Sequence, residues 1–156
     1  MIRIERTNDI EYIKQCVTHP KIWDYSTDDG SVEKSIYVPL IADVVYWLMV
    51  VEDSPLGVFL LHPHNSICFE VHTCLLPKIW GRSVECTLAG IDWMWENTSC
   101  RRIITNVPEY NLLAIRLAER SGLLRFGENP KSYLKNGILY NQIMLGISKE
   151  DKCQQQ

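Results

Sequence analysis

The 156-residue chain lacks several features that would place a protein in a familiar class. No apolar run approaches the ~20 residues that a membrane span needs, and residues 1–6 contain no hydrophobic signal-peptide region. No basic block with interleaved aromatic residues offers a surface for nucleic acid. Internal repeats and linkers are also absent. We therefore expect one domain over residues 1–148, a polar C-terminal tail over residues 149–156, a cytoplasmic location, and neither a membrane nor a nucleic-acid partner.

The composition is that of a globular protein of modest charge. Hydrophobic residues make up 46% of the chain, and 16 basic against 19 acidic residues give a formal net charge of -3. A chain of this length buries roughly two-thirds of the surface that its unfolded form exposes. A single hydrophobic core is therefore expected.

The six cysteines include no Cys-x-x-Cys pair, and several of them lie in apolar periodic segments. Without a secretory signal, this arrangement favours free core thiols over disulfides. His62, His64, Cys68 and His72 surround one expected hairpin but do not have a recognised zinc spacing. We expect turn and surface histidines here, with a metal site as the less favoured alternative. The cysteines and histidines also show no signature of a covalent nucleophile.

Hydrophobic periodicity and turn residues predict the order strand, helix, a loop or short helix, three strands, helix, strand, helix and two strands. Asn8 with Glu11 resembles a capping box, and Gly122 is expected to close a helix. The segment 23–35 carries acidic and aromatic side chains and is expected to form a loop or short helix. The expected strands are 2–5, 44–52, 58–61, 67–76, 101–107, 123–127 and 138–146, and the expected helices are 8–18, 83–97 and 110–120.

The segment 68–84 is the most informative part of the chain, because a strand pattern ends at Pro77 and restarts as a helix. The turn 78–81 frees backbone N–H groups at a helix N-terminus, where the helix dipole favours an anion such as phosphate. Ser83 is the expected N-cap. An apolar stripe is expected to follow at Val84, Leu88, Ile91 and Trp95. The alternative is that Pro77 and Gly81 only make a tight connection.

The element order and two motifs resemble the GNAT superfamily of acyl-CoA-dependent N-acyltransferases. Segment 75–85 (LLPKIWGRSVE) looks like the end of that family's fourth strand and its pyrophosphate loop. Segment 111–123 (NLLAIRLAERSGL) looks like its N-x-x-A-x-x-L-Y-E-x-x-G-F helix. The resemblance covers residues 2–147. It implies an α/β (α+β) fold with a mixed, mostly antiparallel central sheet of about six or seven strands, flanked by helices.

Both motifs depart from the family pattern. A gapless alignment puts Trp80, Ser83 and Glu85 at the three marked positions of the phosphate loop, so two glycines are missing. Glycine lets backbone amides approach a pyrophosphate, and a Glu beside it adds like-charge repulsion. Ala118 stands where many family members have a Tyr that protonates the leaving thiolate. The alternatives are that Tyr110, Tyr133, Tyr140 or water takes the place of this Tyr, or that nothing does.

The resemblance implies acetyl-CoA as cofactor and a small-molecule or protein amine as acceptor. Glu70 and His72 are the candidate catalytic bases, because they share one face of the strand that leads to Leu75. The alternative is that they lie on the wrong sheet face or pair with neighbours. Asn111 would point toward the cofactor, or only cap its helix. The expected cofactor-binding residues are Leu75, Gly81, Arg82, Ser83, Val84 and Asn111.

A second hypothesis belongs to another functional class. The pattern E-V-H-T-x-x-L-P, followed by a helix with two tryptophans, looks like a phage-encoded GNAT-like group in which some members are head-assembly proteins. Such a protein would use the fold as a noncatalytic scaffold in virion morphogenesis, in the host cytoplasm, with phage structural proteins as partners. A degenerate cofactor loop would then be harmless. The candidate interface aromatics are Trp23, Tyr25, Tyr37, Trp47 and Trp80.

Overall fold

A computed structural model describes residues 1–153 of the chain, and its strands form one seven-stranded sheet in the order β1-β2-β3-β4-β5-β7-β6. All neighbouring strands are antiparallel except β4 and β5. This confirms the expected mixed, mostly antiparallel sheet and the expected order of elements. The strands are β1 (Arg3–Arg6), β2 (Tyr46–Val51), β3 (Pro55–Pro63), β4 (Cys68–Leu75), β5 (Arg102–Pro108), β6 (Leu124–Lys135) and β7 (Ile138–Ser148).

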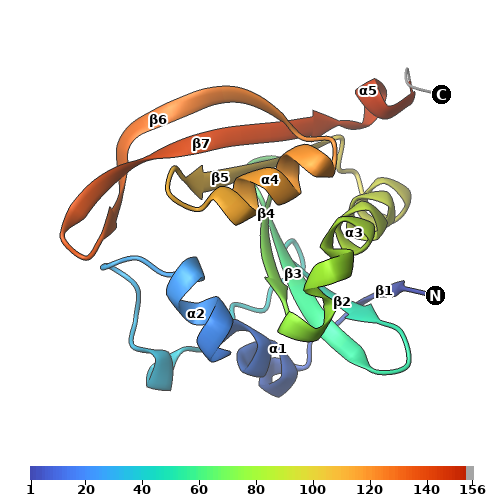
Figure 1. Cartoon of the computed structure of the whole chain (residues 1–156). Helices are drawn as coiled ribbons and strands as arrows, with labels where there is room; N and C mark the ends of the chain where they lie inside the picture. The colour runs from blue at the N-terminus through green and yellow to red at the C-terminus, as the bar shows by residue number, and fades with distance from the viewer. Residues whose placement is uncertain (154–156) are drawn as a thin grey trace.

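Helices cover both faces of the sheet (Figure 1). The helices α3 and α4 cover a larger core built around Phe59, Met94 and Ile103, whereas α1 and α2 cover a smaller core on the opposite face around Ile13, Trp47 and Val58. No helix within residues 1–153 is both long and apolar enough to cross a bilayer. The helices are α1 (Ile10–Val17), α2 (Pro20–Ser26), α3 (Ser83–Asn97), α4 (Leu112–Arg120) and α5 (Lys149–Cys153), with the 3-10 turns η1 (Lys34–Ile36) and η2 (Pro77–Arg82).

The antiparallel meander β2-β3-β4 depends on a close approach at Gly57. This glycine has a φ of +134°, and a Cβ at its position would lie 2.6 Å from the Cys74 carbonyl oxygen and 2.6 Å from the Leu75 Cα. L residues with a side chain rarely adopt this backbone conformation. Gly57 therefore fixes how closely β3 packs against the end of β4.

The last hairpin is longer than the expected strands 123–127 and 138–146, because the residues between them also belong to it. Strands β6 and β7 continue to a tight turn at Asn136 and Gly137, which have φ values of 52° and 75°. Asn-Gly is the pair that such turns favour. The Asp29 carboxylate accepts hydrogen bonds from both turn N–H groups, at 2.8 and 2.9 Å. Figure 1 shows this arched hairpin reaching back toward the end of α2.

Two predicted N-caps are wrong by one residue. Asp9, rather than Asn8, caps α1, because its side chain accepts a hydrogen bond from the Tyr12 N–H. Ser83 is the first residue of α3 and not its N-cap, and its hydroxyl donates to the Trp80 carbonyl at 2.7 Å. The Ser83 side chain therefore binds a carbonyl of η2 instead of accepting from the N–H groups of the first turn of α3.

The expected apolar stripe of α3 is wrong in part. Ile91 and Trp95 are buried, but Leu88 is 37% exposed. The buried face runs instead through Cys86, Thr87, Gly90, Ile91, Met94 and Trp95. This face includes Cys86, Thr87 and Gly90, which are small enough to pack closely against the sheet. A prediction based on large apolar residues alone leaves them out.

The segment after α1 is more ordered than a simple helix stop. His19 caps α2, which starts at Pro20 and takes in the first part of the acidic and aromatic segment.

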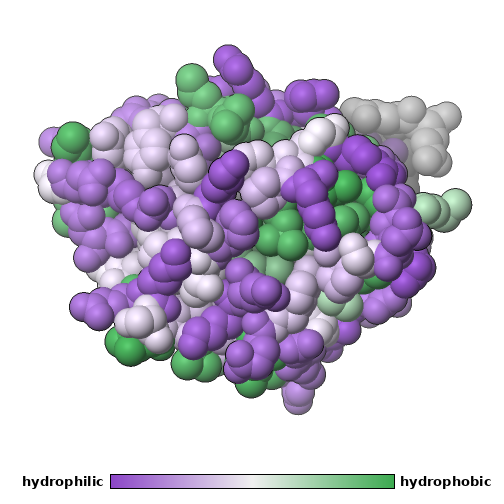
Figure 2. Space-filling view, turned by 60° about the horizontal axis from the view of Figure 1, so that its bottom comes forward, coloured by the Kyte–Doolittle hydropathy of each residue, from purple (hydrophilic) through white to green (hydrophobic). Residues whose placement is uncertain are grey.

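On the surface that includes the lower edge of Figure 1, apolar residues lie in separate patches between polar ones (Figure 2). Trp47 is 2% exposed, so it is not available as an interface aromatic.

The start of the expected tail is helical. Within α5, Lys149 donates to the Trp95 carbonyl at 3.1 Å and Glu150 pairs with Arg101. Residues 154–156 of that tail lie outside the described residues. Free thiols are found at all five described cysteine side chains, Cys16, Cys68, Cys74, Cys86 and Cys100, as expected.

Candidate active site between β4 and β5

The parallel strands β4 and β5 separate after a short stretch of pairing. They pair from Cys68 with Arg102 to Glu70 with Ile104, and no further. Beyond that point β4 stays paired with β3 up to Leu75, whereas β5 follows β7 to Pro108. Because each strand keeps its outer partner, the sheet opens into a gap between them.

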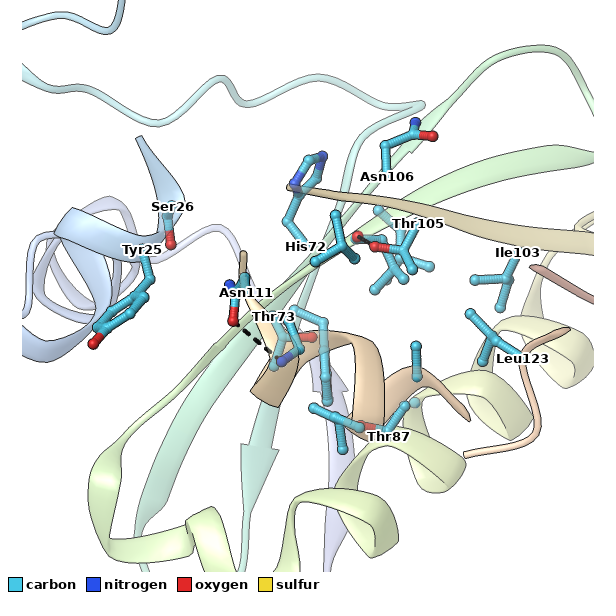
Figure 3. A pocket seen from close by; sticks show the side chains of 18 of the residues that line it. Tyr25, Ser26, His72, Thr73, Thr87, Ile103, Thr105, Asn106, Asn111 and Leu123 are labelled. Atoms are coloured by element: carbon cyan, nitrogen blue, oxygen red, sulfur yellow. Dashed lines mark hydrogen bonds between the residues drawn. The ribbon is translucent and has the colours of Figure 1, made fainter. Parts of the chain in front are cut away.

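A cavity of about 150 Å³ occupies this gap, enough for several water molecules. Its lining comes from both sides of the sheet, since it includes Thr87 on α3 and Tyr25 and Ser26 on α2. Figure 3 shows His72 and Asn106 at the upper end of the cavity in that view and Thr87 at the lower end. A long molecule that lies against α3 could therefore meet a second molecule that enters beside α2.

Backbone groups of β4 face this gap. The Leu76 N–H donates to the Leu56 carbonyl at 2.9 Å. Because successive residues of an antiparallel strand direct their backbone groups to opposite sides, Thr73 and Leu75 direct theirs toward β5. Their N–H groups lie past the last β4–β5 pair, where a ligand's oxygen could accept from them. The Leu75 carbonyl accepts from the Trp80 indole at 2.8 Å, which fixes the end of the strand.

Glu70 lies at the centre of a histidine cluster at the base of the gap. Its Oε2 atom is 3.1 Å from His62 Nε2, 3.3 Å from His64 Nε2 and 4.0 Å from His72 Nε2. The His62 and His72 Nε2 atoms are 3.0 Å apart. Asn106 Nδ2 donates to the other carboxylate oxygen, Oε1. We name these four side chains, His62, His64, Glu70 and His72, the histidine cluster.

Strand register explains why the cluster forms. His62 lies directly opposite Glu70 in the β3–β4 pair, and His72 lies on the diagonal two residues along β4. His64 lies just after the end of β3, and its ring stacks on that of His62 with the ring centroids 5.8 Å apart. The Asn65 side chain accepts from the Ile67 and Cys68 N–H groups and closes the turn between the strands.

The cluster also sets the charge of its members. Burial raises the pKa of Glu70, but hydrogen bonds from His62 and Asn106, with the neighbouring histidines, outweigh it and bring the pKa to about 2. Glu70 is therefore a carboxylate at neutral pH. Partial desolvation lowers the pKa of His72, and the charge of Glu70 opposes this only in part.

Glu70 and His72 do share one strand face, as expected, but they meet the cavity differently. His72 is among the residues that line the cavity, and Glu70 is not. The Glu70 side chain is 12% exposed and turns toward the histidines, whereas the His72 side chain is 48% exposed. Of the two candidate bases, His72 is therefore the one that a substrate in the cavity would contact, and Glu70 lies behind it.

The expected phosphate site lies at the start of α3, and η2 separates it from the end of β4. Arg82 there pairs with Glu52 at 2.8 Å and with Glu85 at 2.9 Å. A Cβ at Gly81 would meet nothing within 4 Å, so the backbone is open to solvent at that position. Ser83 and Val84 are partly buried in the first turn of the helix. A pyrophosphate at this place would have to compete with two carboxylates for the one arginine.

The remaining predicted residues lie on α4 and nearby. Asn111 lines the cavity and also caps α4, because its side chain accepts from the Ala114 N–H at 3.2 Å. Both of its expected roles are thus compatible with its position (Figure 3). Ala118 lines the cavity too. Tyr110, Tyr133 and Tyr140 pack against one another, and none of them is among the lining residues.

Sequence reasoning missed three contributors. Asn106 orients Glu70 from β5, and no pattern in the sequence indicates that pairing. Tyr25 and Ser26 reach the cavity from α2. The alternation of His62, His64, Glu70 and His72 across one hairpin was a usable signal, because it places all four on one sheet face once the strands are paired.

No known protein-family model matches the chain, and no curated protein matches it in sequence. Among solved structures, a spermidine N-acetyltransferase from Vibrio cholerae, in complex with CoA and spermine, aligns with a TM-score of 0.79, 14% identity, and 96% of both chains covered. A GNAT-family acetyltransferase from Bacillus anthracis aligns with a TM-score of 0.72, 16% identity, and 96% of this chain and 95% of that chain covered. The chain therefore has the fold of the GNAT acetyltransferases.

Proposed function

We propose that this protein is an acetyl-CoA-dependent N-acetyltransferase that acts in the cytoplasm. The observation that carries the proposal is the gap between β4 and β5, into which two backbone N–H groups of β4 and the His72 side chain are directed. A general base beside oxyanion donors is what transfer of an acyl group to an amine requires. The fold is that of acetyltransferases, one of which binds CoA and spermine.

The reaction needs no covalent enzyme intermediate. A neutral amine attacks the thioester carbonyl, the new C–N bond forms, and the C–S bond breaks. The N–H groups of Thr73 and Leu75 stabilise the oxyanion, and His72 accepts the proton that the amine loses. The proton that the leaving thiolate gains comes from water, since Ala118 replaces the usual Tyr. Glu70, held by Asn106, positions His72 through the histidine cluster.

The two substrates would enter from opposite faces of the sheet. Acetyl-CoA would lie against α3 and α4, with its pyrophosphate at residues 81–84 and its pantetheine arm along Leu75 and Asn111. The acceptor amine would enter beside Tyr25 and Ser26 of α2. Both a small-molecule amine and a protein amine would fit this description.

One observation favours a second function, that of a noncatalytic scaffold in phage head assembly. Arg82 already has two carboxylate partners where a cofactor's phosphates would bind. A chain that no longer binds CoA would tolerate this arrangement. The partners would then be phage structural proteins, and the aromatic residues with exposed surface, such as Tyr25 and Trp80, would contact them.

A thermal-unfolding titration with acetyl-CoA and CoA separates the two functions. A ligand at ~100 times its Kd adds about 2.7 kcal/mol of stability, which raises the unfolding temperature by several degrees. A saturable rise supports the acetyltransferase, and the absence of a rise at millimolar cofactor supports the scaffold.

Turnover is then measured with a panel of amines that includes polyamines and N-terminal peptides. His72→Ala should lower kcat by about 100-fold or more, because general bases contribute 10²–10⁴-fold. His19→Asn is the matched control, since His19 caps α2 away from the cavity and Asn is a good cap. Unchanged turnover in His72→Ala would remove this residue from the mechanism.

A further inference from the structure

His62, His64 and Glu70 bring three potential metal ligands to one point. Their ligand atoms, two imidazole nitrogens and one carboxylate oxygen, all lie within 4.8 Å of one another. His72 borders the same point, 3.0 Å from His62 and 4.0 Å from Glu70. In the proposed acetyl transfer His72 is the base and the rest of the cluster only positions it, so His62 and His64 have no direct part in the chemistry.

Hydrogen bonds alone do not account well for this convergence. The His62 Nε2 atom is close to both the Glu70 carboxylate and His72 Nε2. A neutral ring nitrogen carries either one hydrogen or one lone pair, so it cannot donate fully to the carboxylate and also accept from His72. A cation in the centre would accept the lone pairs of every group that faces it.

We propose that His62, His64 and Glu70 bind a divalent transition-metal ion, with Zn²⁺ the best match. Two imidazoles and one carboxylate form the three-ligand set of open zinc sites, in which the fourth position holds water or another group. Here that position is next to His72. The imidazole-rich donor set disfavours Ca²⁺ and Mg²⁺, which prefer oxygen ligands.

The spacing of the ligands fits such an ion. Bonds of ~2.0–2.2 Å to a tetrahedral zinc place ligand atoms about 3.3–3.6 Å apart. The separations of Glu70 Oε2 from the His62 and His64 nitrogens are 3.1 and 3.3 Å. The His62 and His64 nitrogens lie within 4.8 Å of each other, so a side-chain rotation that brings them to the tetrahedral spacing completes the site.

The surroundings also support binding. Asn106 holds the second carboxylate oxygen, which is how outer hydrogen bonds orient a ligating carboxylate. The side chains of His62 and His64 are 35% and 44% exposed, so an ion can reach them from solvent. Both histidines are fixed by the short hairpin that joins β3 to β4.

The site has a consequence that rests on the proposed function. A bound ion would hold Glu70 and block His72, so metal would inhibit acetyl transfer and a chelator would restore it. The metal site itself does not depend on the activity. A protein that binds zinc but transfers no acetyl group would contradict only the proposed function.

The direct test is a calorimetric titration of the chelator-treated full chain with ZnCl₂, alongside thermal unfolding with and without the ion. We expect one equivalent to bind and to raise the unfolding temperature. His64→Ala should weaken this binding by about 100-fold or more, because it removes a ligand from the ion. Glu70→Gln should have a similar effect.

His19→Asn removes the one histidine outside the cluster and should bind zinc like the native chain. His64 is exposed in a turn, so His64→Ala keeps the test valid even if Glu70→Gln does not fold. Two results would overturn the site: no binding by the native chain, or equal binding by His64→Ala. The second result would assign the ion to cysteine thiols or other groups.

Discussion

The middle of β4 and the segment beyond the end of β4, where α3 starts, differ in how their charges are arranged. In the middle, Glu70 is surrounded by three histidines and an asparagine that all favour its negative charge. At the end, the single positive charge of Arg82 is shared between Glu52 and Glu85. The first arrangement is open to an incoming amine or cation, whereas the second has its arginine already occupied. The Glu70 carboxylate on β4 can therefore still bind a cation, whereas Arg82, beyond the end of β4, is already paired within the chain.

The largest effect should come from a change at the end of β4, where Gly57 of β3 packs against the backbone of β4. Gly57→Ala adds a Cβ that meets backbone atoms of β4 at 2.6 Å, in a backbone conformation with φ of +134°. Strain and steric overlap of this kind should lower the free energy of unfolding by about 3 kcal/mol or more. Urea denaturation measures this change.

Gly81→Ala is the matched control for that experiment, because a Cβ there meets nothing within 4 Å. Its stability should stay within about 0.5 kcal/mol of the native value, as for most surface substitutions. Similar stability losses in the two variants would show that the close approach of β3 and β4 is unimportant.

A smaller effect is expected from loosening the middle of the strand alone. Asn106→Ala removes the hydrogen bond to Glu70 Oε1 and leaves the carboxylate free to rotate. Loss of such an orienting partner should lower both turnover and zinc affinity by about 10-fold or more. Kinetic assays and zinc titration measure the two effects separately.

The control is Asn97→Ala, since Asn97 donates only to the Trp93 carbonyl at the end of α3. It should leave both quantities unchanged. If Asn106→Ala behaves like this control, Glu70 does not depend on β5 for its orientation.

The end of the strand can be tested by freeing Arg82. The double variant Glu52→Gln with Glu85→Gln removes both carboxylates that pair with it. CoA should then bind up to about fivefold more tightly, since exposed ion pairs have small effects. The gain should shrink in high salt, because mobile ions screen surface charges.

Glu96→Gln supplies the comparison for CoA binding, as an exposed glutamate at the far end of the same helix. It should leave the affinity unchanged. A double variant with native affinity would mean that pyrophosphate does not meet Arg82, and the expected cofactor position would need revision.

The smallest effect concerns the hairpin that approaches α2, on the acceptor side of the cavity. Hydrogen bonds from the Gly137 and Asn136 N–H groups lower the pKa of Asp29 below its usual 3.8. The stabilisation is present above that value and is lost as the pH falls through the lower folded pKa. Native protein should therefore lose stability below pH 3.8 relative to Asp29→Asn, as measured by thermal unfolding at several pH values.

Asp24→Asn is the control, because Asp24 contributes its backbone carbonyl, not its carboxylate, to the contact with Lys135. Its pH dependence should match that of the native chain. An Asp29→Asn variant with the same acid sensitivity as the native chain would show that the turn does not depend on this carboxylate.

Most of the fold could be predicted from local patterns. The alternation of apolar residues and the turn at 53–57 predicted the meander, and the Ser83 to Asn97 limits of α3 were predicted correctly. Errors arose where two local signals competed. The Asn136–Gly137 turn was missed because the polar residues before it resemble a loop, whereas long-range contacts of Lys135 with Asp24 and of Asn136 with Asp29 stabilise this part of the hairpin.

The candidate site was predictable only along β4. Glu70 and His72 were found because strand periodicity places both on one face. Their different access to the cavity depends on where β5 leaves β4, and Asn106 comes from a strand 36 residues away in the chain. The assigned roles of the cofactor-binding residues remain predictions.

The sequence by itself determined the order of strands and helices, the free cysteines of the core and the shared strand face of Glu70 and His72, because these follow from short periodic patterns. Only the tertiary structure decided that three histidines and Asn106 surround the Glu70 carboxylate. It also decided that Arg82 pairs with both Glu52 and Glu85. Such meetings depend on strand register and on contacts between distant segments. A local pattern does not encode these distances, whereas the packing of the whole sheet fixes them.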